Sequence, residues 1–181
     1  MKYAIAFWAC MGPFAAVPAW ADMCPAVPDT SAAQAEILLK IQSAPSERDA
    51  RPLAAAMWAI WAKAPDAASQ ELLDTGMERL RISDFGGAIV ALDALVEYCP
   101  AYAEGYNQRA FVNFLQNKFE PALVDLDKAI ARNPTHVAAI AGKALTLIGM
   151  GREDDAQEVL REALDLNPWL SERRLLKGTD L

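Results

Sequence analysis

Small and apolar residues return at a fixed interval of 34 positions from Ser69 onward. The sequence divides there without a gap into three rows, 69–102, 103–136 and 137–170. In every row, a small residue occupies the eighth and the twentieth place, leucine occupies the twenty-fourth, and proline occupies the thirty-second. These residues are Gly76, Ala110 and Ala144; Ala88, Ala122 and Ala156; Leu92, Leu126 and Leu160; and Pro100, Pro134 and Pro168. Such a frame indicates a repeated structural unit.

Each row predicts two helices joined by a short turn. In the second row, Tyr106, Ala110 and Phe114 have helical spacing, and so do Leu126 and Ile130. The segments ISDFG, QNKFE and GMGRED separate the two halves of each row, and proline ends the second half because it cannot continue a helix. One such hairpin cannot bury its apolar face alone. We therefore expect an all-α fold, an α-solenoid of stacked antiparallel helix hairpins.

Ahead of the rows, residues 22–68 predict a linker and then a degenerate repeat or N-terminal capping hairpin. Thr30 is placed to cap its first helix, and Pro52 suits the first turn of its second. The second helix carries an apolar stripe of Leu53, Met57, Ile60 and Trp61, widened by Trp58. We expect this stripe to pack against the first row, although its tryptophans could instead form a partner-binding patch.

Residues 171–181 predict a short amphipathic helix that caps the last repeat, since solenoids need a polar face at each end. The residues expected to face inward are Trp169, Leu170, Leu175 and Leu176, and those expected to face outward are Arg173, Arg174 and Lys177. The three basic residues could instead form a docking patch.

The first 21 residues have the features of a secretory signal peptide. Lys2 precedes an apolar stretch, 3–20, and Ala19 and Ala21 place small side chains where signal peptidase needs them. We expect cleavage after Ala21, a periplasmic or secreted protein, and no membrane insertion after signal removal. An uncleaved membrane anchor is the alternative.

Cleavage of the signal peptide determines which cysteines the mature protein keeps. Cys10 would leave with the signal, so Cys24 and Cys99 would remain. Two cysteines in an oxidising compartment favour one disulfide, which would stabilise the fold by about 4 kcal/mol. Two unpaired thiols are the alternative.

Composition and charge narrow the choice of partner. The chain of 181 residues is 54% hydrophobic, which supports a buried core, and has a net charge of -7 with a pI near 4.7. An acidic surface repels phosphate groups, so neither nucleic acid nor an anionic membrane is expected as a partner.

We find no motif for catalysis. HExxH, paired CxxC and GxSxG are missing from the sequence, and the glycines of FGG and GMG suit turns rather than a phosphate-binding loop. The single histidine, His136, stands in the turn before the third row, where we expect it to be exposed. We therefore expect neither an enzyme nor a cofactor or metal site.

The rows resemble tetratricopeptide repeats in their 34-residue period and in their frame of small residues, leucine and proline. The resemblance covers 69–170, and the segment YNQRAFVNFLQNKFEPALVDLDKAIARNP matches it well. Arg109 and Lys143 depart from the leucine that is usual in the family, and Asn113 departs from an aromatic residue. The resemblance places Arg109 opposite Asp125 across a hairpin. We expect a partly buried ion pair there, with two solvated charges as the alternative.

The resemblance also implies that the first helix of each row lines a concave groove. The implied groove residues are Leu73, Met77, Asn107, Phe111, Phe114, Leu145 and Ile148. This set is mostly apolar, and Asn107 could hydrogen-bond a peptide backbone. The family's clamp for cytosolic chaperone tails needs lysine and asparagine where Leu73 and Met77 stand, so we do not expect that function.

Together these features predict a non-enzymatic protein–protein interaction module. We expect an adaptor of the cell envelope that holds a peptide or helix of a protein partner in its groove. The alternative is a structural subunit or homo-oligomer whose groove is filled by its own segments.

Overall fold

A computed structural model describes residues 24–178 and is helical throughout its regular elements there. The expected signal peptide lies outside the described residues. In chain order the elements are α1 (Ser31–Gln42), α2 (Glu47–Trp61), α3 (Ala67–Arg81), α4 (Phe85–Tyr98), α5 (Ala103–Leu115), α6 (Phe119–Arg132), α7 (Val137–Gly149), α8 (Glu153–Leu166) and the short 3-10 helix η1 (Ser171–Leu175). This confirms the all-α prediction.

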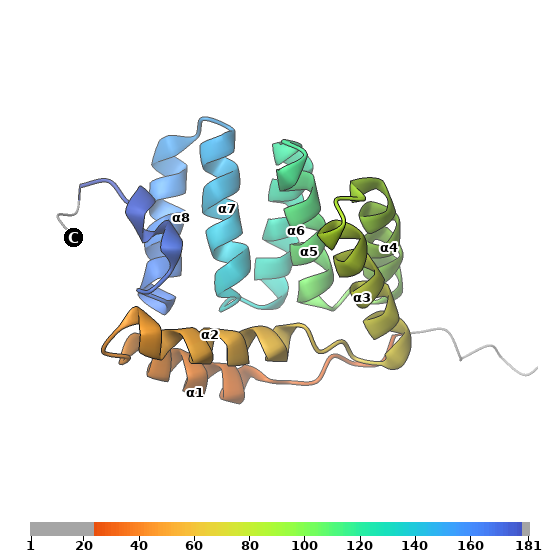
Figure 1. Cartoon of the computed structure of the whole chain (residues 1–181), viewed down its shortest axis with the longest axis horizontal. Helices are drawn as coiled ribbons and strands as arrows, with labels where there is room; N and C mark the ends of the chain where they lie inside the picture. Colours follow the sequence, from red (N-terminus) through yellow and green to blue (C-terminus); the bar gives the residue numbers. More distant parts are fainter. Residues whose placement is uncertain (1–23, 179–181) are drawn as a thin grey trace, which may run out of the picture.

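Helices α3 to α8 form three hairpins that stand side by side in a solenoid (Figure 1). The residues of the 34-residue frame hold these hairpins together. Ala88, Ala122 and Ala156 are fully buried at the contacts, and so are Leu92 and Leu160. Side chains this small let paired helices approach closely, and the leucines fill the space between them.

The small residue at the eighth place has a direct steric reason in the first hairpin. A Cβ atom added to Gly76 would lie 2.7 Å from Cγ of Leu92 on the facing helix. No side chain fits there unless Leu92 moves, so the glycine permits this close contact between α3 and α4.

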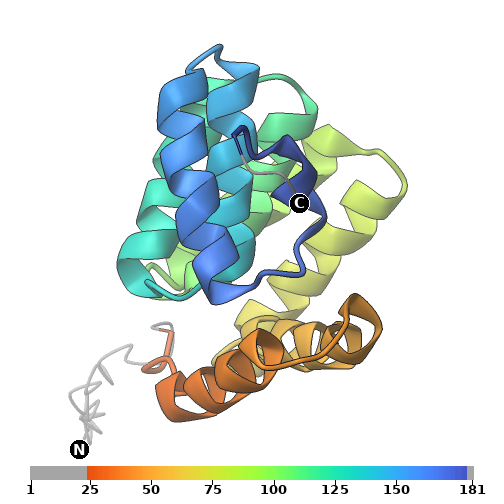
Figure 2. The ribbon, with the colours of Figure 1, turned by 90° about the vertical axis from the view of Figure 1, so that its left-hand side faces the viewer.

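The hairpin of α1 and α2 does not stack on the first repeat. It lies across the ends of the repeat helices, and α2 runs beneath them from α8 toward α3 (Figures 1 and 2). Met57 and Trp61 are buried there against Val137 of α7, with Leu166 and Leu170 at the edge of the cluster. Met57 and Trp61 of this stripe are thus core, as expected, but they pack against the third row. The apolar end of that row supplies the surface that the stripe covers.

The C-terminal segment differs from the amphipathic helix expected over 171–181. Of this range the structure describes 171–178, where η1 is the only helix, and Leu175 is 43% exposed instead of facing inward. Arg173 turns back toward the fold, where it pairs with Glu47 of α2 at 3.0 Å and donates to the carbonyl oxygens of Trp169 and Leu170. These bonds hold the segment against the α1–α2 hairpin.

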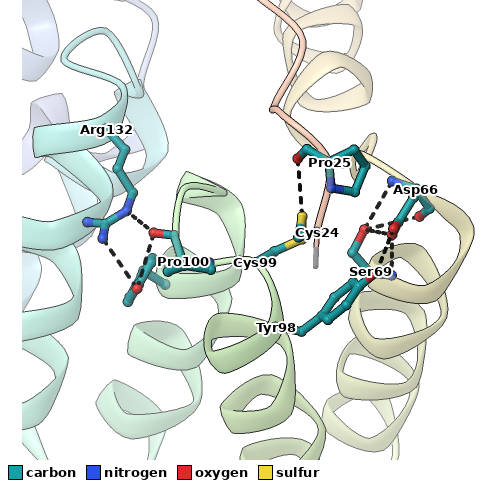
Figure 3. Close-up of a disulfide and its surroundings, with 9 residues drawn as sticks. Cys24, Pro25, Asp66, Ser69, Tyr98, Cys99, Pro100 and Arg132 are labelled. Carbon is teal, nitrogen blue, oxygen red and sulfur yellow. Dashed lines mark hydrogen bonds between the residues drawn. A yellow bond between two sulfur atoms is a disulfide. The ribbon is translucent and has the colours of Figure 1, made fainter. Parts of the chain in front are cut away.

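Cys24 and Cys99 are joined in a disulfide, with Cα atoms 5.1 Å apart across 75 positions of sequence (Figure 3). The bond ties the segment before α1 to the end of α4. Beside it, Asp66 caps α3, accepting hydrogen bonds from Ser69 and from the Tyr98 hydroxyl, and these bonds lower the pKa of Asp66.

Among residues 24–178, no helix has both the length and the apolar character needed to cross a membrane.

Candidate functional site

A groove of about 760 Å³ opens on the concave side of the repeats. Helices α3, α5 and α7 form its floor, α2 forms a side wall, and the segment 167–172 closes the space beside α7. The apolar residues that line it include Met77, Leu80, Phe111, Phe114 and Leu145 from the floor and Ala50, Ala54 and Trp58 from the wall. A concave space of this size with a mostly apolar lining is typical of a binding site.

The structure brings together five of the seven residues that the resemblance placed in the groove. Met77, Asn107, Phe111, Phe114 and Leu145 line it, and Phe111 remains 48% exposed. The other two lie elsewhere.

Leu73 is fully buried in the core beside Leu92 and Leu95, and Ile148 is half-buried without reaching the groove. The sequence did not predict a groove wall from α2, although a partner-binding patch of its tryptophans was the alternative left open. The tryptophan at position 58 was the available signal, because it widens the stripe of α2 beyond what the core needs.

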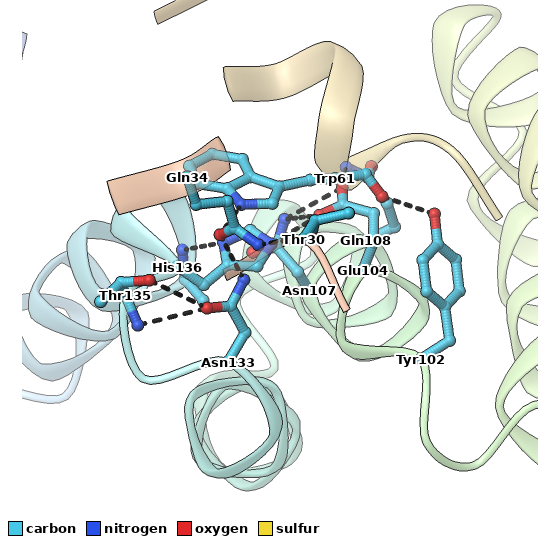
Figure 4. A network of polar contacts seen from close by, with 11 residues as sticks. Thr30, Gln34, Trp61, Tyr102, Glu104, Asn107, Gln108, Asn133, Thr135 and His136 are labelled. Carbon is cyan, nitrogen blue, oxygen red and sulfur yellow. Dashed lines mark hydrogen bonds and ion pairs between the residues drawn. The ribbon is translucent and has the colours of Figure 1, made fainter. Parts of the chain in front are cut away.

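Glu104 is buried at the start of α5, beside the groove (Figure 4). Its carboxylate accepts hydrogen bonds from Nδ2 of Asn107 at 3.2 Å, from Nε2 of Gln108, and from Nε2 of His136 at 2.8 Å. A buried carboxylate is stable only when its oxygens are well supplied with donors, and this one has three. Its position in the first turn of α5 also suits the helix dipole.

His136 is fully buried, so the expectation of an exposed turn histidine is wrong. Its ring stacks on Trp61 with centroids 4.1 Å apart, and its Nδ1 accepts a hydrogen bond from the backbone N–H of Ala139 at 3.3 Å, which caps α7. Because Nδ1 accepts, the proton lies on Nε2 and points at Glu104. The assigned tautomer is therefore neutral, and the α2 tryptophan shields it from water.

Gln34 connects the α1–α2 hairpin to the repeats. Its Oε1 accepts from Nε1 of Trp61 and from Nδ2 of Asn133, both at 2.9 Å, and its Nε2 donates to Thr30 (Figure 4). Nearby, the Tyr102 hydroxyl donates to the backbone oxygen of Trp61 at 2.6 Å. Burial raises the pKa of Tyr102 above its ordinary value. These bonds keep the groove wall in place.

The expected ion pair of Arg109 and Asp125 is confirmed. The guanidinium of Arg109 contacts both carboxylate oxygens of Asp125 at 2.7 Å, and it also reaches Asp93 of α4 at 2.7 Å. The hydrogen bond to Asp125 raises the pKa of Arg109. None of the three residues lines the groove, so the cluster joins α4, α5 and α6 rather than contributing to the site.

Within residues 24–178, no group of three or more histidine, cysteine, aspartate or glutamate side chains is arranged to hold a metal ion.

Residues 113–172 match the family model described as tetratricopeptide repeat. A TPR repeat-containing protein of Rhizobium etli is 28% identical over 81 residues, which cover 45% of this chain and 40% of that protein. A tetratricopeptide repeat protein 36 homolog of Nematostella vectensis is 36% identical over 66 residues, or 36% of each chain. The matches thus span two fifths or less of the relatives' length.

Solved structures show the same fold. The TPR2B domain of yeast Sti1, in its complex with pHsp70, is 28% identical with a TM-score of 0.56, covering 60% of this chain and 89% of that domain. The first TPR of Spaghetti (RPAP3), bound to an HSP90 peptide, is 19% identical with a TM-score of 0.58, covering 60% and 86%. MamA is 17% identical with a TM-score of 0.52, covering 82% and 79%.

Proposed function

We propose that this chain, whose residues 113–172 match the tetratricopeptide repeat model, is a protein-interaction module whose groove binds a peptide or helix of a protein partner. The observation that carries the proposal is the groove itself, in which Phe111 stays 48% exposed on an apolar floor. Aromatic side chains exposed in a concave site are favoured anchors for a partner. The Sti1 domain, with the same fold, was solved in complex with pHsp70, which supports this mode of action.

The alternative, a structural subunit whose groove is filled by its own segments, has one observation in its favour. Helix α2 already lies along the groove, and Trp58 and Ala54 occupy part of its side. About 760 Å³ nevertheless remains open between α2 and the floor. That remaining space favours a separate partner, with α2 as a permanent wall.

We also propose that the protein works in the cell envelope, outside the cytoplasm. The disulfide between Cys24 and Cys99 supports this place, because such bonds persist in oxidising compartments and are rare in the cytosol. The signal peptide expected over 1–21 points the same way.

The groove is tested by comparing two variants in cells. Leu145→Asp places a charge on the groove floor, whereas Val90→Asp places one on α4, where Val90 is 71% exposed outside the groove. With a photo-crosslinker at position 111, we expect one recurrent crosslinked partner that Leu145→Asp abolishes and Val90→Asp retains. Desolvating an unpaired carboxylate in an apolar site lowers affinity by a factor of ten or more, roughly.

Circular dichroism checks that both variants remain folded. If the partner crosslinks equally to both variants, the groove is not the binding site.

A further inference from the structure

We infer that the groove recognises a basic side chain, so that the bound segment is an apolar peptide carrying a lysine or arginine. This inference rests on the proposed function and specifies its partner. It follows from the acceptor corner, which we define as Asn107 and Gln108 lining the groove above the buried carboxylate of Glu104.

Glu104 determines how the two amides of the acceptor corner point. Only the NH₂ group of an amide can face a carboxylate, since an amide oxygen there would be repelled. Asn107 and Gln108 both donate to Glu104 through these groups. Their amide oxygens are therefore turned away from Glu104.

These two oxygens have no donor among the described residues, although Asn107 is only 7% exposed and Gln108 only 5%. In the same part of the chain, no side-chain nitrogen or oxygen that is fully enclosed lacks a hydrogen-bond partner. Each oxygen is therefore accessible, and we infer that it faces the groove that its residue lines. A ligand loses affinity if it covers such acceptors without supplying donors.

Charge selects which donor is preferred. The Glu104 carboxylate lies behind the two amide oxygens, and among the described residues no lysine or arginine contacts it. Its partner His136 accepts at Nδ1 and is neutral in that assigned tautomer. A lysine ammonium or an arginine guanidinium supplies donors and positive charge together, and charge-assisted hydrogen bonds are about twice as strong as neutral ones.

The other charged residues along the groove leave this preference in place. Arg81 is held by Glu78 through two bonds of 2.7 and 2.8 Å. Glu47 binds Arg173 at 3.0 Å and lies 3.7 Å from Arg51, whereas Glu172 has no ion pair among the described residues. The arginines of the lining thus have acidic neighbours, and Glu172 adds an unpaired negative charge. The net charge of -7 favours approach of a cationic segment as well.

The rest of the lining determines what surrounds the basic residue. Phe111, Phe114, Leu145 and Trp58 offer apolar contact on both sides of the groove. A partner that satisfies the acceptor corner and this lining carries aliphatic or aromatic side chains next to its lysine or arginine.

A library of random dodecapeptides displayed on phage provides the probe, selected against the disulfide-bonded protein. Leu145→Asp serves as the counter-selection target. We expect the peptides that bind only the unmodified protein to carry a lysine or arginine flanked by apolar residues.

One selected peptide is then synthesised in three forms, with lysine, with norleucine and with glutamate at the basic position. Fluorescence anisotropy measures each affinity. We expect norleucine to weaken binding about tenfold and glutamate to weaken it further, because a charge-assisted bond is lost and then opposed. Against Asn107→Leu, which removes one acceptor at similar size, the difference between lysine and norleucine should shrink.

The outcomes separate the two proposals. Peptides that depend on Leu145 but bind equally well with norleucine overturn the basic-residue inference and leave the groove as a peptide site. A selection that enriches no peptide dependent on Leu145 overturns both. The peptide substitutions need no protein variant, so they stay decisive if Asn107→Leu fails to fold.

Discussion

Arg109 shows what one side chain contributes to this solenoid. It lies on α5 and binds Asp125 on α6 and Asp93 on α4, so that one guanidinium connects three helices. The side chain of Asp125 is 5% exposed, and its only other cationic neighbour is Lys128, at 3.7 Å among the described residues. The resemblance to tetratricopeptide repeats was enough to place Arg109 opposite Asp125.

Replacing Arg109 by methionine keeps much of its volume and leaves the Asp125 carboxylate buried without its main partner. We expect the free energy of unfolding to fall by about 3 kcal/mol, because an uncompensated buried charge remains. Urea denaturation measures the change.

Arg152→Met is the matched control. Arg152 pairs with Asp155, but both side chains are about half exposed, and such surface pairs contribute about 1 kcal/mol or less. Equal effects of the two substitutions would contradict the role given to Arg109.

His136 behaves differently from Arg109 because its surroundings come from distant parts of the sequence. Glu104 lies 32 positions away, and Trp61 comes from the hairpin ahead of the repeats. A lone histidine in a turn has no local signal that predicts burial. Its position depends on where α2 packs, and the 34-residue pattern says nothing about that.

At the scale of single elements, one turn recurs at the fifteenth place of every row. Ser83, Asn117 and Gly151 all have positive φ angles, of 61°, 56° and 74°. In the first repeat, the N–H of Ser83 bonds to the carbonyl of Leu80 and that of the next residue bonds to Arg79, which ends α3 in a left-handed cap. Glycine is favoured at this position, asparagine is tolerated, and serine is strained.

The substitution Ser83→Gly should therefore stabilise the protein by roughly 0.5–1 kcal/mol, since it removes backbone strain and loses only an exposed side chain. Gly151→Ala should destabilise it by a similar amount, because a Cβ atom is introduced where φ is 74° although no atom lies nearby. Thermal unfolding followed by circular dichroism measures both. If alanine at 151 is neutral, the cap does not control the end of α7.

At the scale of the whole molecule, the placement of the α1–α2 hairpin converts an open solenoid into a one-sided groove. Gln34 and Trp61 link the hairpin to the repeats, and Glu47 links it to Arg173 of the C-terminal segment. The disulfide from Cys24 to Cys99 holds the segment that leads into α1. The groove wall is thus attached at several points far apart in sequence.

Replacing both Cys24 and Cys99 by serine should lower the free energy of unfolding by about 4 kcal/mol. The bond closes a loop across 75 positions, and its loss enlarges the ensemble of the unfolded chain. Urea denaturation with and without dithiothreitol measures this effect. The unmodified protein should become less stable in dithiothreitol, and the double variant should not respond. A variant as stable as the unmodified protein would show that the bond adds nothing.

The repeated hairpins could be predicted from the sequence alone, because their evidence is local. Helical spacing, small residues at close contacts and proline after each second helix all act within 34 residues. For the same reason, most of the groove floor, from Met77 to Leu145, could be placed from the resemblance. Three features became evident only from the tertiary structure: the wall from α2, the burial of His136 and the direction of the Asn107 and Gln108 amides. These depend on contacts between segments far apart in the chain, where packing and hydrogen bonding compete without any periodic signal.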